Sequence, residues 1–283
     1  MTMQLAIGMF DYDLPLDEGI ARMRRLGVRR VELVCPKNVV IADAETVRKH
    51  LAEAGLETSA VATLTKPNAV DDPEEVAMTL DLLQESIRVA AILGASRAIT
   101  YFGGHPTRSH NEAVERYVEL VGPSLEVAAE HGVDVLIENH FSHAPGEVTN
   151  TPGGCRELIE AVGHPNFALN FDPCNFAVGG EDQVEAYDRL KDLVRNVHMK
   201  DTLPFNPDEH SDYPGRIVTD LHRGDFIFAP MGTGITDNQT VLKRLNADGY
   251  DGPVSVEAHT PQDTLDEVFA IGRDYCLANG VER

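Results

Sequence analysis

The sequence predicts an α/β protein built as a single (β/α)8 TIM barrel. Short apolar runs of strand length alternate along the chain with longer amphipathic segments, and most of those segments are followed by a glycine. Strict alternation of strands and helices implies parallel strands joined by helical crossovers. Eight such units in 283 residues favour a closed barrel over an open sheet.

The first half of the chain supplies four strand–helix units. Its strands are expected where β-branched and other apolar residues cluster, at 5–10, 28–34, 58–64 and 96–104. Its helices are expected at 16–26, 44–54, 73–93 and 111–131. A glycine directly follows each of these helices, and the third begins with Pro73, which the first turn of a helix accepts readily.

The second half repeats the pattern. Its strands are expected at 134–140, 167–172, 194–201 and 253–259, and its helices at 152–162, 181–193, 238–248 and 261–277. No linker, low-complexity segment or shift in composition divides the chain, so we expect residues 1–283 to form one domain. The irregular stretch 202–236, rich in Pro, Asp, Gly and His, is predicted to be a long functional loop, either a lid or a substrate wall.

Four polar residues lie at or near the ends of the last four strands. They alternate with apolar neighbours, so they point to the same side of their strands: Glu138, Asp172, His198 and Glu257. In a barrel of this kind the catalytic groups lie at the C-terminal ends of the strands, and adjacent strand ends about 4.8 Å apart can surround one ion. Three carboxylates and one imidazole suit Mn²⁺ best, with Mg²⁺, Co²⁺ or Zn²⁺ as alternatives.

Other polar residues near the strand ends are candidate substrate contacts. His140 and His259 share the phase of the two glutamates but lie two residues further out, where they contact either substrate or solvent. Lys200 is expected either to polarise a substrate hydroxyl or to pair with a neighbouring carboxylate. His105 after the fourth strand and Arg223 in the long loop reach either the substrate or solvent. A further residue, Glu32, could face the barrel interior, where it would need a partner.

Composition narrows the class of partner. The chain has 24 basic and 46 acidic residues and a net charge of −22, which disfavours binding to nucleic acid or to anionic lipid. Its four cysteines form no CxxC pair, so neither a disulfide framework nor a zinc–thiolate site is expected. The N-terminus lacks a secretory signal, and no apolar run reaches the length of a membrane span. A cytoplasmic enzyme, monomeric or a homo-oligomer, fits best.

At these residues the sequence resembles the xylose isomerase-like TIM barrels of the sugar phosphate isomerase/epimerase superfamily. The resemblance covers essentially the whole chain and includes VELV at 31–34, IENH at 137–140, NFDPCN at 170–175, HMKD at 198–201, PMGTGITD at 230–237 and DGYDGPVSVEAH at 248–259. The resemblance implies one divalent metal ion held by the four ligands named above. It also implies that Glu138 and Glu257 serve as acid/base groups, as in the ketose 3-epimerase members.

Two departures from the family pattern keep other activities open. Several epimerases and the endonuclease-IV-like members place a histidine three residues after the aspartate, where this chain has Asn175. The trinuclear zinc site of those DNA-repair enzymes therefore looks incomplete, which leaves endonuclease activity a remote alternative. The interval of 59 residues between His198 and Glu257 is more like that of inosose dehydratase.

The predicted activity is a divalent-metal-dependent isomerisation or epimerisation of a ketose through an enediolate. The principal alternative is dehydration by an inosose-type lyase, because the same enediolate can lose a β-hydroxyl. The predicted strand ends carry no Arg/Lys cluster and no phosphate-binding loop. The substrate is therefore expected to be a non-phosphorylated sugar or cyclitol.

Overall fold

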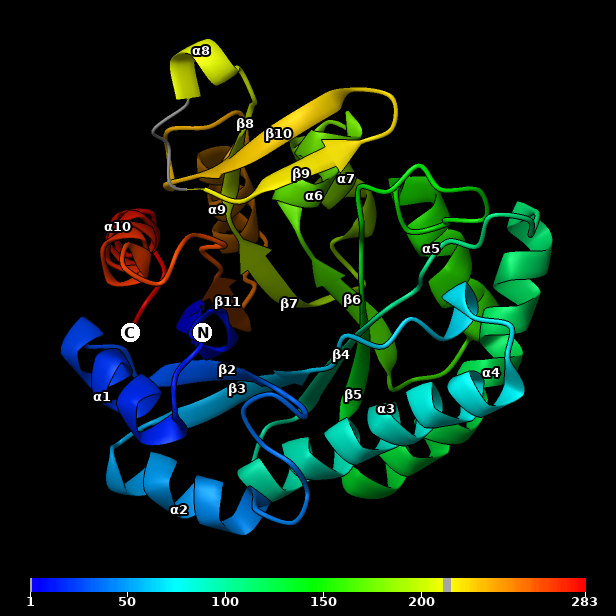
Figure 1. Ribbon diagram of the computed structural model, residues 1–283, viewed down its shortest axis with the longest axis horizontal. Coiled ribbons are helices and arrows are strands. Elements are labelled where there is room, and N and C mark those ends of the chain that lie inside the picture. The colour runs from blue at the N-terminus through cyan, green and yellow to red at the C-terminus, as the bar shows by residue number, and fades with distance from the viewer. Residues whose placement is uncertain (1, 211–214) are drawn as a thin grey trace.

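Eight parallel strands close into a barrel in the computed structural model, which describes residues 2–210 and 215–283 (Figure 1). The strands are β1 (Gln4–Gly8), β2 (Arg30–Val34), β3 (Glu57–Ala62), β4 (Arg97–Tyr101), β5 (Asp134–Glu138), β6 (Phe167–Phe171), β7 (Val194–Met199) and β11 (Pro253–Val256). Successive barrel strands are neighbours, and β1 pairs with β11 to close the ring. The predicted (β/α)8 architecture is confirmed.

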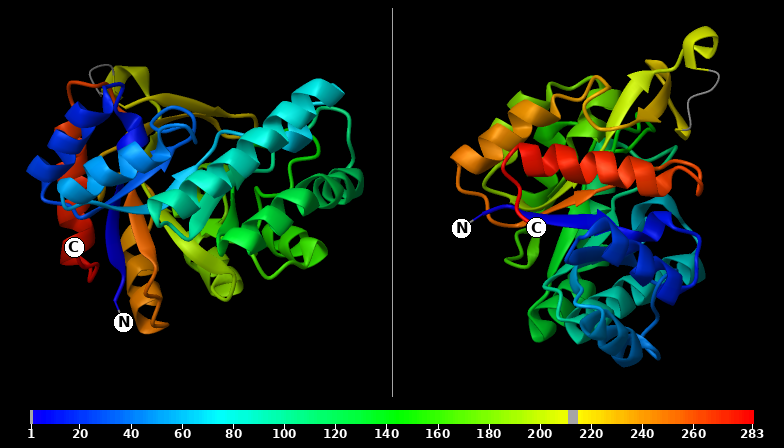
Figure 2. Two further views of the ribbon diagram at one scale, coloured as in Figure 1. Left: turned by 90° about the horizontal axis from the view of Figure 1, so that it is seen from below. Right: turned by 90° about the vertical axis from the view of Figure 1, so that its left-hand side faces the viewer.

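Helices surround this barrel, as the views from two further directions show (Figure 2). They are α1 (Leu16–Leu26), α2 (Ala44–Glu53), α3 (Pro73–Leu93), α4 (His110–His131), α5 (Pro152–Val162), α6 (Pro173–Gly179), α7 (Gln183–Leu190), α9 (Asn238–Ala247) and α10 (Leu265–Ala278), with short 3-10 turns at Met9–Asp11 and Pro67–Ala69. Side-chain caps fix several starts; the Asp72 carboxylate, for example, accepts the backbone N–H of Glu74. Within the described ranges, none of the helices is both long and apolar enough to cross a membrane.

The helical segment predicted at 181–193 differs from the structure. A separate short helix, α6, precedes it and begins directly after Asp172, whose carboxylate accepts the N–H of Asn175 at 3.0 Å. The helix itself, α7, is shorter than predicted and begins after Asp182, which caps it in the same way. Pro173 at the first position of α6 explains why this helix starts so sharply.

The stretch 202–236 is not the irregular loop that its composition suggests. It contains a small antiparallel sheet of order β8-β10-β9, formed by β8 (Asp201–Pro204), β9 (Ile217–Asp220) and β10 (Gly224–Ala229), with a short helix α8 (Pro207–His210); residues 211–214 lie outside the described part. The apolar end of β10 is buried, which gives the sheet its own packed face. Figure 1 shows this sheet beyond the ends of β7 and β6.

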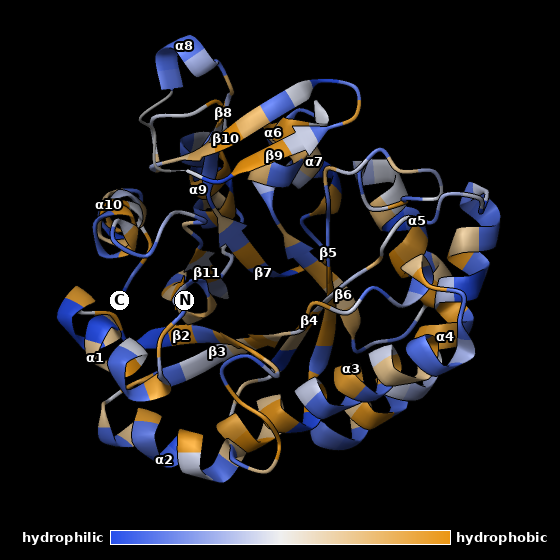
Figure 3. Cartoon of the chain, in the orientation of Figure 1, coloured by the Kyte–Doolittle hydropathy of each residue, from blue (hydrophilic) through white to orange (hydrophobic). Residues whose placement is uncertain are grey.

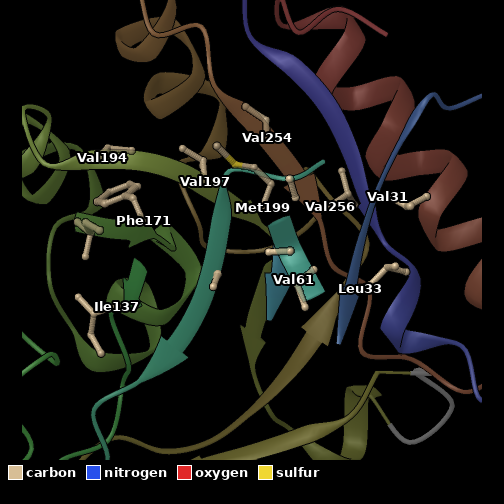
Figure 4. Packing of buried hydrophobic residues seen from close by; sticks show 14 of the residues in the cluster. Val31, Leu33, Val61, Ile137, Phe171, Val194, Val197, Met199, Val254 and Val256 are labelled. Carbon is tan, nitrogen blue, oxygen red and sulfur yellow. The ribbon is translucent and has the colours of Figure 1, made fainter. Parts of the chain in front are cut away.

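The core has two unequal parts. The larger lies between the strands and the helices, and includes Val31, Val61, Val254 and Val256 (Figure 4). The smaller lies inside the barrel, where six buried apolar residues pack together: Val34, Ala60, Ala62, Ile99, Leu136 and Ala168. Colouring by hydropathy shows apolar and polar residues mixed along the surrounding helices (Figure 3). Because the inner layer is small, polar side chains occupy the rest of the barrel interior.

Asp201 anchors the small sheet and the segment that follows it to the end of β7. Its side chain is buried and accepts four backbone N–H groups, from Thr202, Gly232, Gly234 and Thr236, at 2.9 to 3.1 Å. A Cβ atom at Gly234 would lie 2.2 Å from the Asp201 carboxylate, so only glycine allows the approach. The carboxylate therefore replaces the hydrogen bonds that this backbone lacks.

We expect the substitution Asp201→Asn to lower the free energy of unfolding by about 2 to 4 kcal/mol. The amide keeps the size of the side chain but turns an NH₂ group toward two of the backbone donors, which leaves them buried and unpaired. Urea-induced unfolding measures the change. Asp208→Asn in exposed α8 is the matched control and should alter stability by no more than about 0.5 kcal/mol. An equal effect of the two substitutions would contradict this account.

Candidate metal centre

The structure brings together the four side chains that the strand phase placed on one side. Glu138 ends β5, and Asp172, His198 and Glu257 lie at the ends of β6, β7 and β11. One ligand atom from each lies within 4.8 Å of the others, and none of the four residues is more than 4% exposed. This buried group could hold one metal ion.

Three asparagines hold the Glu138 carboxylate in place. Asn175 Nδ2 donates to Oε1 at 3.1 Å, and Asn170 Nδ2 donates to Oε2 at 3.0 Å. Asn196 in turn donates to the side-chain oxygen of Asn170 at 2.9 Å. Asn175, which the sequence presented only as a departure from the family histidine, therefore orients a candidate ligand.

Carboxylates lie on both sides of the His198 ring, one at Nε2 and two at Nδ1. Its Nε2 lies 3.0 Å from Glu32 Oε1, and Ser255 Oγ donates to Glu32 at 2.9 Å, so Glu32 has the interior partners that it was expected to need. Its Nδ1 lies 3.1 Å from Glu257 and 3.2 Å from Glu138. When Nε2–H donates to Glu32, the Nδ1 lone pair points at the candidate ligands, which is the usual arrangement of a metal-binding histidine.

Lys200 forms an ion pair with the carboxylates, one of the two roles expected for it. Its Nζ lies 2.5 Å from both Asp172 Oδ2 and Glu257 Oε2. Burial lowers the pKa of Lys200, but the charges of Asp172 and Glu257 outweigh burial and raise it well above its ordinary value. Likewise, burial raises the pKa of Glu257 while His198 and Lys200 hold it well below its ordinary value.

His259 has a strained backbone that a carboxylate holds in place. Its φ is 47°, the left-handed region that residues other than glycine rarely adopt. Asp11 Oδ1 lies 3.1 Å from His259 Nδ1, and Asp11 Oδ2 accepts the N–H of the preceding Ala258. His259 Nε2 lies 3.3 Å from Glu257 Oε2. Burial lowers the pKa of His259, but Asp11 and Glu257 together raise it more, to about 9.

The donor set fits a divalent cation. Asp172 Oδ2 and His198 Nδ1 are buried and have no well-directed hydrogen bond. Three buried carboxylates, those of Glu138, Asp172 and Glu257, lie 2.5 to 3.9 Å from the Lys200 ammonium, and a fourth, that of Glu32, lies beside His198. A divalent ion coordinated by the four candidate ligands would add positive charge among these carboxylates. Mostly oxygen donors with one imidazole also match the hard or borderline cations expected from the sequence.

A cavity of about 410 Å³ opens beside these residues, at the C-terminal end of the barrel. It is lined by Leu64, Lys66, Tyr101, Glu138, His140, Phe141, Asn175, Lys200, Arg216, Val218, Phe228 and His259. Part of its wall is the small sheet, which is tied to the barrel because Arg216 N–H donates to the His259 carbonyl at 2.9 Å. Three of the predicted substrate contacts, at positions 140, 200 and 259, therefore line one cavity.

Two of the predicted substrate contacts lie outside this cavity lining. His105 points to Asp71, with its Nε2 2.9 Å from that carboxylate. Arg223 donates to the carbonyls of Ala177 and Val178 at the C-terminal end of α6, where a cation is favoured. Each of these two side chains has a partner in the protein, and contact of either with the substrate stays a prediction.

Residues 20–275 match the xylose isomerase-like TIM barrel family. The chain belongs to this family. A ketose 3-epimerase of Arthrobacter globiformis is 26% identical over 234 residues, which cover 76% of this chain and 68% of that protein. An inosose dehydratase of Lacticaseibacillus casei is 25% identical over 141 residues, or 50% of this chain and 46% of that protein. Known members of the family thus include both an epimerase and a dehydratase.

The fold match to solved members of the xylose isomerase-like family extends over the whole chain. The crystal structure of a D-allulose 3-epimerase from Methylomonas sp. superimposes with a TM-score of 0.76 and covers 98% of each chain at 16% identity. Such low identity shows a shared barrel, while function depends on the side chains at the strand ends. The reaction of this chain must therefore be inferred from the residues that line its cavity.

Sequence reasoning missed several residues of the cavity lining, among them Lys66, Tyr101, Arg216 and Phe228. Lys66 follows β3, Tyr101 ends β4, and the other two lie in the segment that carries the small sheet. Charged or aromatic residues directly after β3 and β4 were an available signal, since that is where barrel sites are built. The other two lie in the stretch 202–236, which was predicted to be a lid or a substrate wall, but their own positions in the cavity depend on the fold of the small sheet.

Proposed function

We propose that the protein is a divalent-metal-dependent sugar isomerase or epimerase that acts on a small polyhydroxylated ketone. The observation that supports it is the buried set Glu138, Asp172, His198 and Glu257, which adjoins a cavity of about 410 Å³. Relatives that include a ketose 3-epimerase agree with this class of substrate. Mn²⁺ is the metal we favour; Mg²⁺, Co²⁺ and Zn²⁺ are alternatives.

The chemistry required is proton transfer at a carbon next to a carbonyl. A divalent ion held by the four ligands would act as a Lewis acid that makes this C–H group more acidic. Glu138 and Glu257 come from opposite ends of the run of ligand strands β5, β6, β7 and β11, so they can approach the substrate from different sides. One carboxylate removes the proton, and the other returns it to the opposite face or to the neighbouring carbon.

Residues around the two glutamates have further roles in this proposal. Lys200 and His259 both contact Glu257 and line the cavity, so they hold this carboxylate, and Lys200 has a third N–H for a substrate hydroxyl. Asn170 and Asn175 hold Glu138 in the same sense. Phe228 and Phe141 provide apolar walls that limit access of water to the reacting carbon.

Dehydration is the second candidate, and a difference between the surroundings of the two glutamates favours it. Glu138 lines the cavity, whereas Glu257 is 2.5 Å from Lys200 and 3.3 Å from His259. If only one glutamate is free to act as the base, the second proton must be returned elsewhere. Protonation of a leaving hydroxyl by a neighbouring N–H donor then gives an inosose-type lyase.

Product mass separates the two candidates. We expect a panel of ketoses and inososes, incubated with the enzyme and Mn²⁺ or Co²⁺, to yield a product of unchanged mass that acquires solvent deuterium at one carbon. The metal-free protein treated with a chelator provides the background. Products that uniformly lose one water molecule and absorb in the ultraviolet would reject the isomerase assignment and establish the lyase.

A further inference from the structure

Three polar side chains line one side of the cavity, each with a polar atom left for a ligand. Lys66 follows β3, Tyr101 ends β4 and His140 follows β5, so they come from three consecutive strand ends. All three also line an adjoining cavity of about 240 Å³. Among the described residues, no side chain hydrogen-bonds or forms an ion pair with the Lys66 ammonium, the Tyr101 hydroxyl or His140 Nε2.

The positions of the three donors are fixed by packing. Gly103 has a φ of 82°, and a Cβ atom there would lie 2.7 Å from the Cβ of Lys66, so the glycine lets the backbone pass against the lysine side chain. The Lys66 Nζ lies 5.8 Å from the centre of the Tyr101 ring. The Tyr101 and His140 rings meet edge to face at 6.4 Å. The three groups therefore form one cluster.

Each member of the cluster offers a hydrogen to a ligand. Ser142 N–H donates to His140 Nδ1 at 3.0 Å, so in the neutral ring Nε2 carries the proton. The nearest cavity carboxylates are already engaged: Glu138 by Asn170 and Asn175, and Glu147 by Thr149. The cluster is thus a cation and two further donors, and among the described residues no carboxylate forms an ion pair with the cation.

We propose that Lys66, Tyr101 and His140 form a subsite for a carboxylate carried by the substrate. An ammonium and two further donors that line one cavity suit the charge and the two acceptor oxygens of a carboxylate. Phosphate sites more often use a cradle of backbone N–H groups at a helix N-terminus, which this cluster lacks. The inference rests on the proposed function and narrows it: the substrate is a polyhydroxylated keto acid rather than a neutral sugar or cyclitol.

Binding of matched probes tests the subsite without using catalysis. We compare gluconate, glucitol and glucitol 6-phosphate by isothermal titration, each with the Mg²⁺-loaded and the chelator-treated protein. Gluconate is expected to bind at least about tenfold more tightly than glucitol, because only gluconate pairs with the ammonium. Lys66→Met should remove this preference while leaving glucitol binding within about twofold of wild type.

The control is Lys49→Met, which removes the same charge from an exposed position on α2 and should keep the gluconate preference. A preference that survives Lys66→Met would overturn the proposal, since the metal or another cation would then bind the carboxylate. Equal binding of gluconate and glucitol by wild type would also overturn it. Tighter binding of the phosphate, lost in Lys66→Met, would overturn the assignment to a carboxylate. If the isomerase assignment is wrong, the mass of the product will show it, and the binding comparison can still be interpreted.

Discussion

Asp172→Ala is expected to remove about one equivalent of bound divalent metal from the protein, and with it all measurable turnover. Asp172 Oδ2 is buried, has no well-directed hydrogen bond and lies in the group of ligand atoms that spans 4.8 Å. Alanine leaves only three of the four ligands. Elemental analysis of the dialysed wild type and variant, after loading with Mn²⁺, gives the number of ions per chain.

A control is needed because Asp172 also caps α6. The chain offers one: Asp182 caps α7 by accepting the N–H groups of Val184 and Glu185, but it contributes nothing to the candidate centre. Asp182→Ala removes a cap of the same kind and should retain the metal. Equal metal content in wild type and Asp172→Ala would reject the four-ligand centre. Loss of metal in both variants would mean that the loss results from impaired folding and not from removal of a ligand.

The candidate ligands could be predicted from the sequence because successive side chains of a strand point to alternate faces. Once apolar residues such as Val197 and Met199 are assigned to the helix-facing side, His198 must point into the barrel. The same rule predicts the interior position of Glu32, Asn170 and Asn196. It also explains why the barrel itself was predictable: eight buried strands and their helices each carry a local pattern, and parallel closure follows from the alternation.

What the sequence did not reveal depends on contacts between distant segments. In the small sheet, β10 pairs with β8 across 22 to 28 positions, as in Phe228 with Thr202, within a stretch whose proline and glycine content is locally typical of a loop. The long-range partners of Arg223 and His105 were not visible in the sequence. Lys66 and Tyr101 become a cluster only because β3 and β4 are neighbours in the closed sheet.

The two glutamates are expected to separate metal binding from proton transfer when each is replaced by glutamine. Glutamine keeps an oxygen that can coordinate a metal ion, but it has no useful basicity near neutral pH. Metal affinity should therefore fall modestly, whereas turnover should fall by roughly 10² to 10⁴ in both Glu138→Gln and Glu257→Gln. Metal content by elemental analysis and turnover by product formation, measured on the same preparations, give the two quantities.

The direction of proton exchange distinguishes the roles of the two groups. In an epimerase each glutamate removes the proton from one epimer, so each glutamine variant should incorporate solvent deuterium starting from one epimer only, and the two variants should differ in which one. In a lyase that uses Glu138 as its only base, Glu257→Gln would keep proton exchange. If both variants held their metal and kept more than about a tenth of wild-type turnover, neither glutamate would be the base. His140, His259 and Lys200, which line the same cavity, would then be the residues to replace.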